Sequence, residues 1–139
     1  MSVLCKTGAK FENMLKLGVG SALTSGTPVK VGFLTGVIEK TADANYDAVV
    51  NVCDGAVYSL SVRNVRTYES GAEATYGAIA VGDKIYFDAS ATMPSGVKLS
   101  TSPLSATDTT NVVFGIALSV EATATAKTSL LMDVMLGVK

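Results

Sequence analysis

The chain has 139 residues, a formal net charge of −1 and no histidine. This length is typical of one domain with a single core, and the scattered lysines and arginines form no basic patch of the kind that binds nucleic acid. No apolar run approaches the ~18 residues that a membrane-spanning helix needs, so we expect neither nucleic acid nor a membrane as a partner.

The composition favours β-structure, because 37 of the 139 residues are Val, Ile or Thr. These β-branched side chains pack well on a pleated sheet and lose rotamer freedom in a helix. We therefore predict an all-β fold, a compact antiparallel barrel or sandwich of about eight short strands. Residues 25–139 are predicted to form this single domain, preceded by an N-terminal arm over residues 1–24.

Residues 10–24 of the predicted arm allow two interpretations. Their apolar side chains lie near helical spacing, but Gly18 and Gly20 each cost about 1 kcal/mol relative to alanine inside a helix. We therefore favour an extended arm. Cys5 and Cys53 could form one disulfide, but the first residues lack the apolar run of a secretory signal, so we expect both to be reduced. Cys53 is expected to be buried in the strand "VVNVC".

The first strands are predicted from alternation of apolar and other residues. In "TPVKVGF", Val29, Val31 and Phe33 alternate with Lys30 and Gly32, which predicts a half-buried strand with those three side chains inside. A strand over "GVIEK" follows, and a polar turn over "TADANYD" comes after it.

The next two strands, "AVVNVC" and "AVYSLSVR", are separated by Asp54 and Gly55. An Asp-Gly pair favours the positive φ angles of a tight hairpin turn, so we predict a hairpin here. In the second strand Tyr58, Leu60 and Val62 share one face, which we assign to the core.

The second half begins with residues 63–75, a polar and mixed segment that we predict to be a long loop. A turn at Gly82 and Asp83 precedes a strand in which Ile85 and Phe87 face the core, and "MPSGVKLSTS" is predicted to contain a turn and a short strand. "VVFGIALSV" and "SLLMDVMLGV" are predicted to be a final pair, and their near-continuous apolar character indicates strands buried on both faces.

Candidate catalytic chemistry is sparse. Without histidine the chain lacks the commonest general base and the most frequent metal ligand. Asp43 with Asp47, and Asp83 with Asp88, could form an acid/base pair or a calcium site, but aspartates in turns usually bond their own backbone. We therefore predict no catalytic residues, no metal site and no cofactor.

Five tyrosines, Tyr46, Tyr58, Tyr68, Tyr76 and Tyr86, leave an alternative function open. Exposed together, they could form a platform for a glycan or receptor. Such rings more often complete a core or an interface and keep the hydroxyl in water.

Four blocks in order carry a resemblance to a known family. They are "SGTPVKVGFLTGVI", "AVVNVCDGAVYSLSV", "GAIAVGDKIYFDAS" and "FGIALSVEATATAKTSLLMDVML". The chain resembles a family of small phage proteins, once catalogued as a domain of unknown function, that is associated with capsid decoration or cementing. The matching residues are Ser25, Gly26, Pro28, Val29, Val31 and Gly32 in the first block, Gly82, Asp83, Lys84, Tyr86 and Asp88 in the third, and Gly115, Ala117 and Leu118 in the last. Residues 63–75 are longer than the family pattern and the first ten residues are extra.

The resemblance implies a structural virion protein with no catalytic residues, made in the host bacterial cytoplasm. Such a protein binds the outside of a phage head, commonly as a homotrimer, and braces neighbouring subunits of the major capsid protein. For this chain we expect the contacts to come from the arm before Ser25 and from the loop at 63–75, because polar segments on a rigid framework usually carry binding. Another structural place in the head or tail fits the same resemblance.

Overall fold

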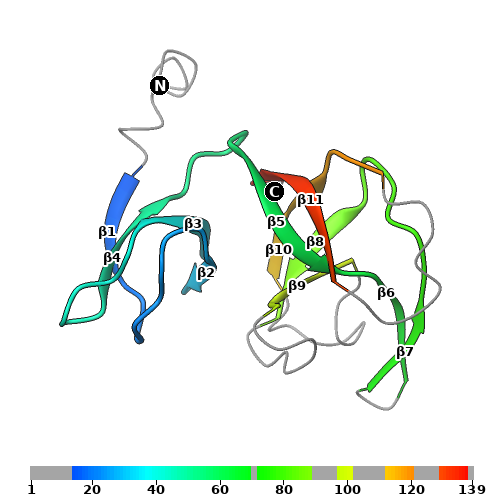
Figure 1. Ribbon diagram of the computed structural model, residues 1–139, viewed down its shortest axis with the longest axis horizontal. Helices are drawn as coiled ribbons and strands as arrows, with labels where there is room; N and C mark the ends of the chain where they lie inside the picture. Colours follow the sequence, from blue (N-terminus) through cyan, green and yellow to red (C-terminus); the bar gives the residue numbers. More distant parts are fainter. Residues whose placement is uncertain (1–13, 70–71, 89–96, 102–111, 121–128, 138–139) are drawn as a thin grey trace. The chain divides into compact units, whose positions relative to one another are not determined.

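The computed structural model describes residues 14–69, 72–88, 97–101, 112–120 and 129–137. Within these ranges the chain forms eleven strands and no helix, which confirms the all-β prediction (Figure 1). The strands are β1 (Met14–Gly18), β2 (Pro28–Val31), β3 (Leu34–Lys40), β4 (Asp47–Asn51), β5 (Val57–Arg63), β6 (Val65–Glu69), β7 (Ala72–Tyr76), β8 (Lys84–Phe87), β9 (Leu99–Ser100), β10 (Val112–Ala117) and β11 (Ser129–Leu136).

The chain divides into two compact units. We call Met1–Ala56 the sheet unit and Val57–Lys139 the barrel unit. The predicted division, an arm over 1–24 and one β-domain over 25–139, stays a prediction. Over the described ranges, no helix is available that could cross a membrane.

The sheet unit contains an open four-stranded sheet in the order β1-β4-β3-β2, in which all neighbours are antiparallel. Alternation along its strands places Val29, Ile38, Ala48 and Val50 in one buried cluster, and Leu17, Val19 and Leu23 pack against that cluster. This confirms Val29 as a core residue.

Strand β1 lies within the segment predicted as an arm, and it is extended as expected. Met14 pairs with Asn51 and Gly18 with Asp47, so β1 covers the whole length of β4. The extended conformation is favoured over a helix because β1 pairs along β4 and Leu17 packs on the core. Phe11 and Cys5 lie outside the described residues.

The turn between β2 and β3 lies earlier in the chain than the sequence pattern indicated. Val31 pairs with Leu34, so Gly32 and Phe33 alone form the turn, and Gly32 adopts a φ of 60°. A glycine in this left-handed region at the first turn position is typical of a tight hairpin. Phe33 is therefore outside the strand and 88% exposed, and the prediction that it faces the core is wrong.

The Asp54-Gly55 turn forms, but it does not make a hairpin. Gly55 has a φ of 90°, and the Ala56 N–H donates to the Cys53 carbonyl at 3.3 Å. Strand β4 before this turn pairs with β1 and β3, whereas β5 after it pairs with β11 and β9. The predicted hairpin is therefore wrong, because each strand has its partners in a different sheet. The turn ends the sheet unit.

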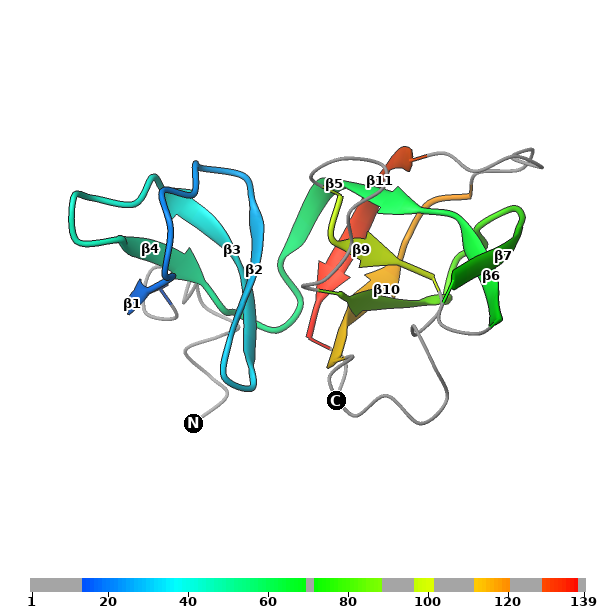
Figure 2. The ribbon, with the colours of Figure 1, turned by 90° about the horizontal axis from the view of Figure 1, so that it is seen from below.

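The barrel unit is a closed barrel of five strands in the order β10-β11-β5-β9-β8 (Figure 2). All neighbours are antiparallel except β5 and β9, where Val62 pairs with Leu99 in a parallel register. Side chains fill the interior of so small a barrel. The buried apolar residues on its strands are Leu60, Val62, Ile85, Phe87, Leu99, Phe114, Ala117, Met132, Val134 and Leu136.

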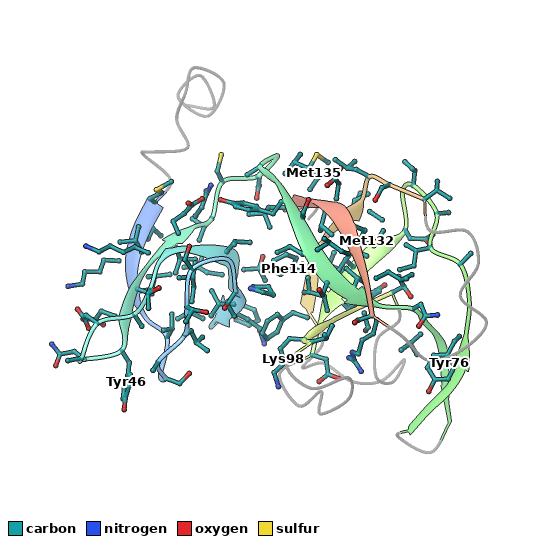
Figure 3. All side chains as sticks on the ribbon, in the orientation of Figure 1. Tyr46, Tyr76, Lys98, Phe114, Met132 and Met135 are labelled. Carbon is teal, nitrogen blue, oxygen red and sulfur yellow. The ribbon has the colours of Figure 1, made fainter. Side chains whose placement is uncertain are left out.

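A β-bulge in β10 breaks the alternation of "VVFGIA". Val113 pairs with Tyr86 and Gly115 with Ile85, so Phe114 is the additional residue. The bulge turns Phe114 into the barrel, where its ring stacks on that of Phe87 with 6.4 Å between centroids. Figure 3 labels Phe114 on β10 and Met132 on β11, two of these interior side chains.

The predicted pairing of the last two strands is confirmed, but the expectation that both faces of each are buried is wrong for β11. Residues 113–117 of β10 are all buried or half-buried. Along β11, Met132 and Val134 are buried while Leu131 and Asp133 are exposed. One face of β11 therefore meets the interior and the other meets solvent, whereas Leu99 and Ser100 of β9 are both buried. The predicted core face of β5 is correct for Leu60 and Val62, and Tyr58 is half-buried.

Residues 63–75, predicted to be a long loop, contain most of a two-stranded hairpin, β6–β7. A lone hairpin is marginally stable in water, so its base must be held by the rest of the unit. The Thr101 hydroxyl donates to the Val65 carbonyl at 2.6 Å, and the Gly77 N–H donates to the Asn64 carbonyl at 3.0 Å. Val65 is fully buried. Figure 1 shows the hairpin beside the barrel, outside its ring of strands.

Candidate contact surface

Asp43 and Asp47 organise the loop between β3 and β4. The Asp43 carboxylate accepts the N–H of Asn45 at 2.8 Å and that of Asp47 at 3.1 Å, and the Lys16 ammonium lies 3.5 Å from it. The bond from Asp47, then the bond from Asn45 and the charge of Lys16, lower the pKa of Asp43. This carboxylate bonds its own backbone, as aspartates in turns commonly do.

Tyr46 lies at the end of this loop in an unusual backbone conformation. Its φ of 60° is in the left-handed region, which is uncommon for a residue other than glycine, asparagine or aspartate. The loop holds it there, since the Tyr46 N–H donates to the Asp43 carbonyl and the Tyr46 carbonyl accepts the Val19 N–H at 2.8 Å. The side chain is 48% exposed and points away from the sheet (Figure 3).

Asp83 and Asp88 lie at opposite ends of β8 and do not form a pair. Asp83 accepts the Ala80 N–H at 2.9 Å and closes the predicted turn, in which Gly82 has a φ of 92°. Asp88 is buried, and its Oδ2 lies 3.5 Å from Nη2 of Arg63 at the end of β5. This ion pair joins the ends of β5 and β8 inside the unit, so Asp88 is paired with Arg63 and the acid/base pair with Asp83 is not formed.

No other chemical centre emerges from the part of the chain that the structure describes. It contains no group of three or more cysteine, aspartate or glutamate side chains that could hold a metal ion. Cys53 is buried as predicted, although β4 ends two residues before it, and its N–H donates to Asn51 Oδ1 at 2.9 Å.

The tyrosines with described side chains lie on different elements. Tyr58, Tyr76 and Tyr86 are half-buried on β5, β7 and β8, and Tyr46 belongs to the sheet unit. The side chain of Tyr68 lies outside the described set. Apart from Tyr46, the described rings are partly covered by the fold.

Two features of the sheet unit are candidates for a contact surface instead. The first is the β2–β3 turn with its exposed Phe33, which the sequence pattern had assigned to the core. The second is the pair of sheet edges, since among the described strands β1 and β2 each have one neighbour only. Strand β2 begins with Pro28, which has no N–H to donate along an edge.

The comparisons with known proteins identify the family. A family model described as phage cement protein matches residues 12–134. The chain belongs to the phage cement protein family. No curated protein and no solved structure matches the chain. The match spans both units and confirms the resemblance carried by the sequence blocks.

Membership of the cement family makes the chain a structural protein of a phage capsid. This agrees with the geometry of the aspartates, which serve turns and an internal ion pair. A cement protein acts through a contact surface. The exposed Phe33 is a candidate contact residue, which the alternating sequence pattern wrongly placed in the core. The signal that could have revealed it was Gly32, which fits a turn as well as a strand face.

Proposed function

We propose that this protein decorates the outer surface of a phage head, where it binds subunits of the major capsid protein and stabilises the contacts between them. The observation that carries the proposal is the cement-family match over residues 12–134. A protein of this kind needs a rigid fold and a large contact area, because it stabilises the shell through the free energy of binding alone. We accordingly propose that it is no enzyme and uses no cofactor, metal ion or nucleic acid.

The β6–β7 hairpin supports residues 63–75 as one contact segment. Thr101 bonds its base at Val65 and the bond from Gly77 to Asn64 closes that base, while its strands lie outside the ring of barrel strands. A short two-stranded ribbon held at its base presents side chains with less loss of conformational entropy than a flexible loop does. We propose the N-terminal arm before Ser25 as the second segment.

We further propose that the protein acts as a homotrimer on the shell. A stable interface usually buries ~800 Å² on each partner, which is a large part of the surface of so small a unit. Three linked copies that dock on equivalent sites raise each other's effective concentration, so individually weak contacts hold together.

The test is a binding assay on mature heads that lack this protein. The purified chain should co-sediment with the heads to a saturating copy number, raise the temperature at which they release DNA, and appear on their outer surface in cryo-electron microscopy. A chain lacking residues 1–10 should bind more weakly while its circular dichroism stays that of the full chain. Failure of the full chain to bind, or density inside the shell, would contradict the proposal.

A further inference from the structure

The β2–β3 turn ends in a continuous apolar tip, which we define as residues 31–34. Exposure rises steadily toward its end: Val29 in the core is 5% exposed, Leu34 is 39% exposed and Phe33 is 88% exposed. Val29, Val31, Leu34 and Ile38 share the core face of the sheet, by alternation along β2 and β3. The apolar core therefore continues into solvent at this end of the sheet unit.

The tip is held by a rigid hairpin. Four residue pairs join β2 to β3, from Pro28–Val37 to Val31–Leu34. At the other end of the hairpin the Gly26 N–H donates to the Ile38 carbonyl at 2.7 Å, and the Ser25 hydroxyl donates to the Glu39 carbonyl at 3.1 Å. Phe33 is thus presented on a fixed backbone, which reduces the entropy lost when it is bound.

The turn itself has no need of phenylalanine at position 33. Its left-handed residue is Gly32, and a polar residue in the second position would suit the surrounding water. Leaving a phenylalanine in water forgoes about 1.5–3 kcal/mol of burial free energy. Adjacent exposed apolar residues at a hairpin end are unfavourable for a protein in solution unless a partner covers them.

We propose that Phe33 is an anchor that inserts into an apolar pocket on a capsid subunit of the shell. The inference rests on the proposed function and names a contact residue that the arm and the β6–β7 hairpin do not include. Aromatic side chains dominate the energetic centres of protein interfaces when they fill a dry pocket. The rim around such an anchor would come from the polar parts of the sheet unit.

The area of the tip favours the shell over a second copy of this chain. A buried phenylalanine covers roughly 150–250 Å², about a quarter of the ~800 Å² that each side of a stable interface needs. Two tips meeting each other would fall far short of that area. An anchor of this size suits a partner that is already fixed, such as a shell surface that other segments of the protein also contact.

The experiment measures binding to heads lacking the protein for Phe33→Ser, Phe33→Leu and a control, Val81→Ser. Val81 is also an apolar turn residue, 57% exposed, beside a left-handed glycine, Gly82, but in the barrel unit. Phe33→Ser should raise Kd by about tenfold or more, Phe33→Leu should raise it less, and Val81→Ser should leave it unchanged. Circular dichroism should show the same fold for all three variants.

A second readout uses the absence of tryptophan from the chain. Phe33→Trp supplies a single indole, whose emission should be that of an exposed ring in the free protein and shift to the blue on heads, after subtraction of the emission of the heads themselves. Parent-like binding by Phe33→Ser, equal losses with Val81→Ser, or loss of self-association instead of head binding would overturn the anchor. Failure of the parent chain to bind heads would instead refute the proposed function.

Discussion

The two units of this cement protein use β-structure in opposite ways. The sheet unit is open, with β1 and β2 at its edges, an exposed aromatic tip and an exposed ion-pair network at Lys16. The barrel unit closes its strands into a ring and holds its ion pair, Arg63–Asp88, in the interior. A closed ring has no edge to offer a partner, whereas an open sheet does. The aromatic tip of the sheet unit is therefore expected to add to the contact proposed for the β6–β7 hairpin, and the buried ion pair is expected to stabilise the barrel unit.

The largest effect on stability is expected for Asp88→Ala, which tests whether the buried ion pair stabilises the barrel unit. The Arg63 and Asp88 side chains are 4% and 6% exposed, so the substitution leaves a buried guanidinium without its carboxylate. Breaking one partner of such a pair costs about 3–5 kcal/mol. Urea denaturation should show this loss. Asp83→Ala is the control, because Asp83 accepts the Ala80 N–H in an exposed turn, and loss of that bond should cost about 1 kcal/mol. Equal losses would mean that the ion pair does not hold the barrel.

The next test compares the glycines Gly115 and Gly36, one in each unit. A Cβ at Gly115 would collide with the Met135 carbonyl oxygen, and one at Gly36 would lie 2.5 Å from the Asn51 carbonyl oxygen. Strands in a closed ring cannot move apart independently, whereas β3 in an open sheet can shift toward its edge. We expect Gly115→Ala to cost about 3 kcal/mol and Gly36→Ala about 1 kcal/mol. Denaturation midpoints of the two variants would check the order, and a reversed order would contradict it.

The smallest effect is expected at Asp43 in the sheet unit. Its pKa is lowered in the folded protein, so the stabilisation is present above its ordinary value of 3.8 and is lost as the pH falls through the folded value. The protection factors of the Asn45 and Asp47 amides, which are corrected for the intrinsic pH dependence of exchange, should therefore fall below pH 4, with those of barrel amides unchanged. Asp43→Asn should remove this pH dependence. If the pH dependence persisted in Asp43→Asn, it would come from another titrating group.

Local patterns predicted much of the fold. The turn at Gly82 and Asp83, the inward faces of β5 and β8, and the pairing of the last two strands follow from turn chemistry and period-two alternation. The bonds that Asp43 and Asp83 accept from nearby backbone N–H groups also follow from the sequence, since an aspartate in a turn commonly bonds its own backbone.

The errors arose where a local signal had two solutions or where the answer depended on distant strands. Gly32 fits both a strand face and a left-handed turn. Alternation alone therefore predicts a strand through residue 33 and places Phe33 in the core, where the structure does not have it. Asp54-Gly55 specifies a turn but not which strands will pair around it. The Arg63–Asp88 pair joins residues 25 positions apart, and nothing near either one in the sequence indicates that it is buried.

The position of β11 in the barrel has a consequence for the order of folding. It is the last strand along the chain, yet it lies between β10 and β5, with Ser59 bonded to Asp133 across a separation of 74 residues. The sheet unit has all its strands once Asn51 has left the ribosome, but the ring cannot close until β11 has been synthesised. Contacts of such long range form slowly. The first half of the nascent chain is therefore expected to be structured well before the second, and newly made copies should become fit for assembly only after the slower step.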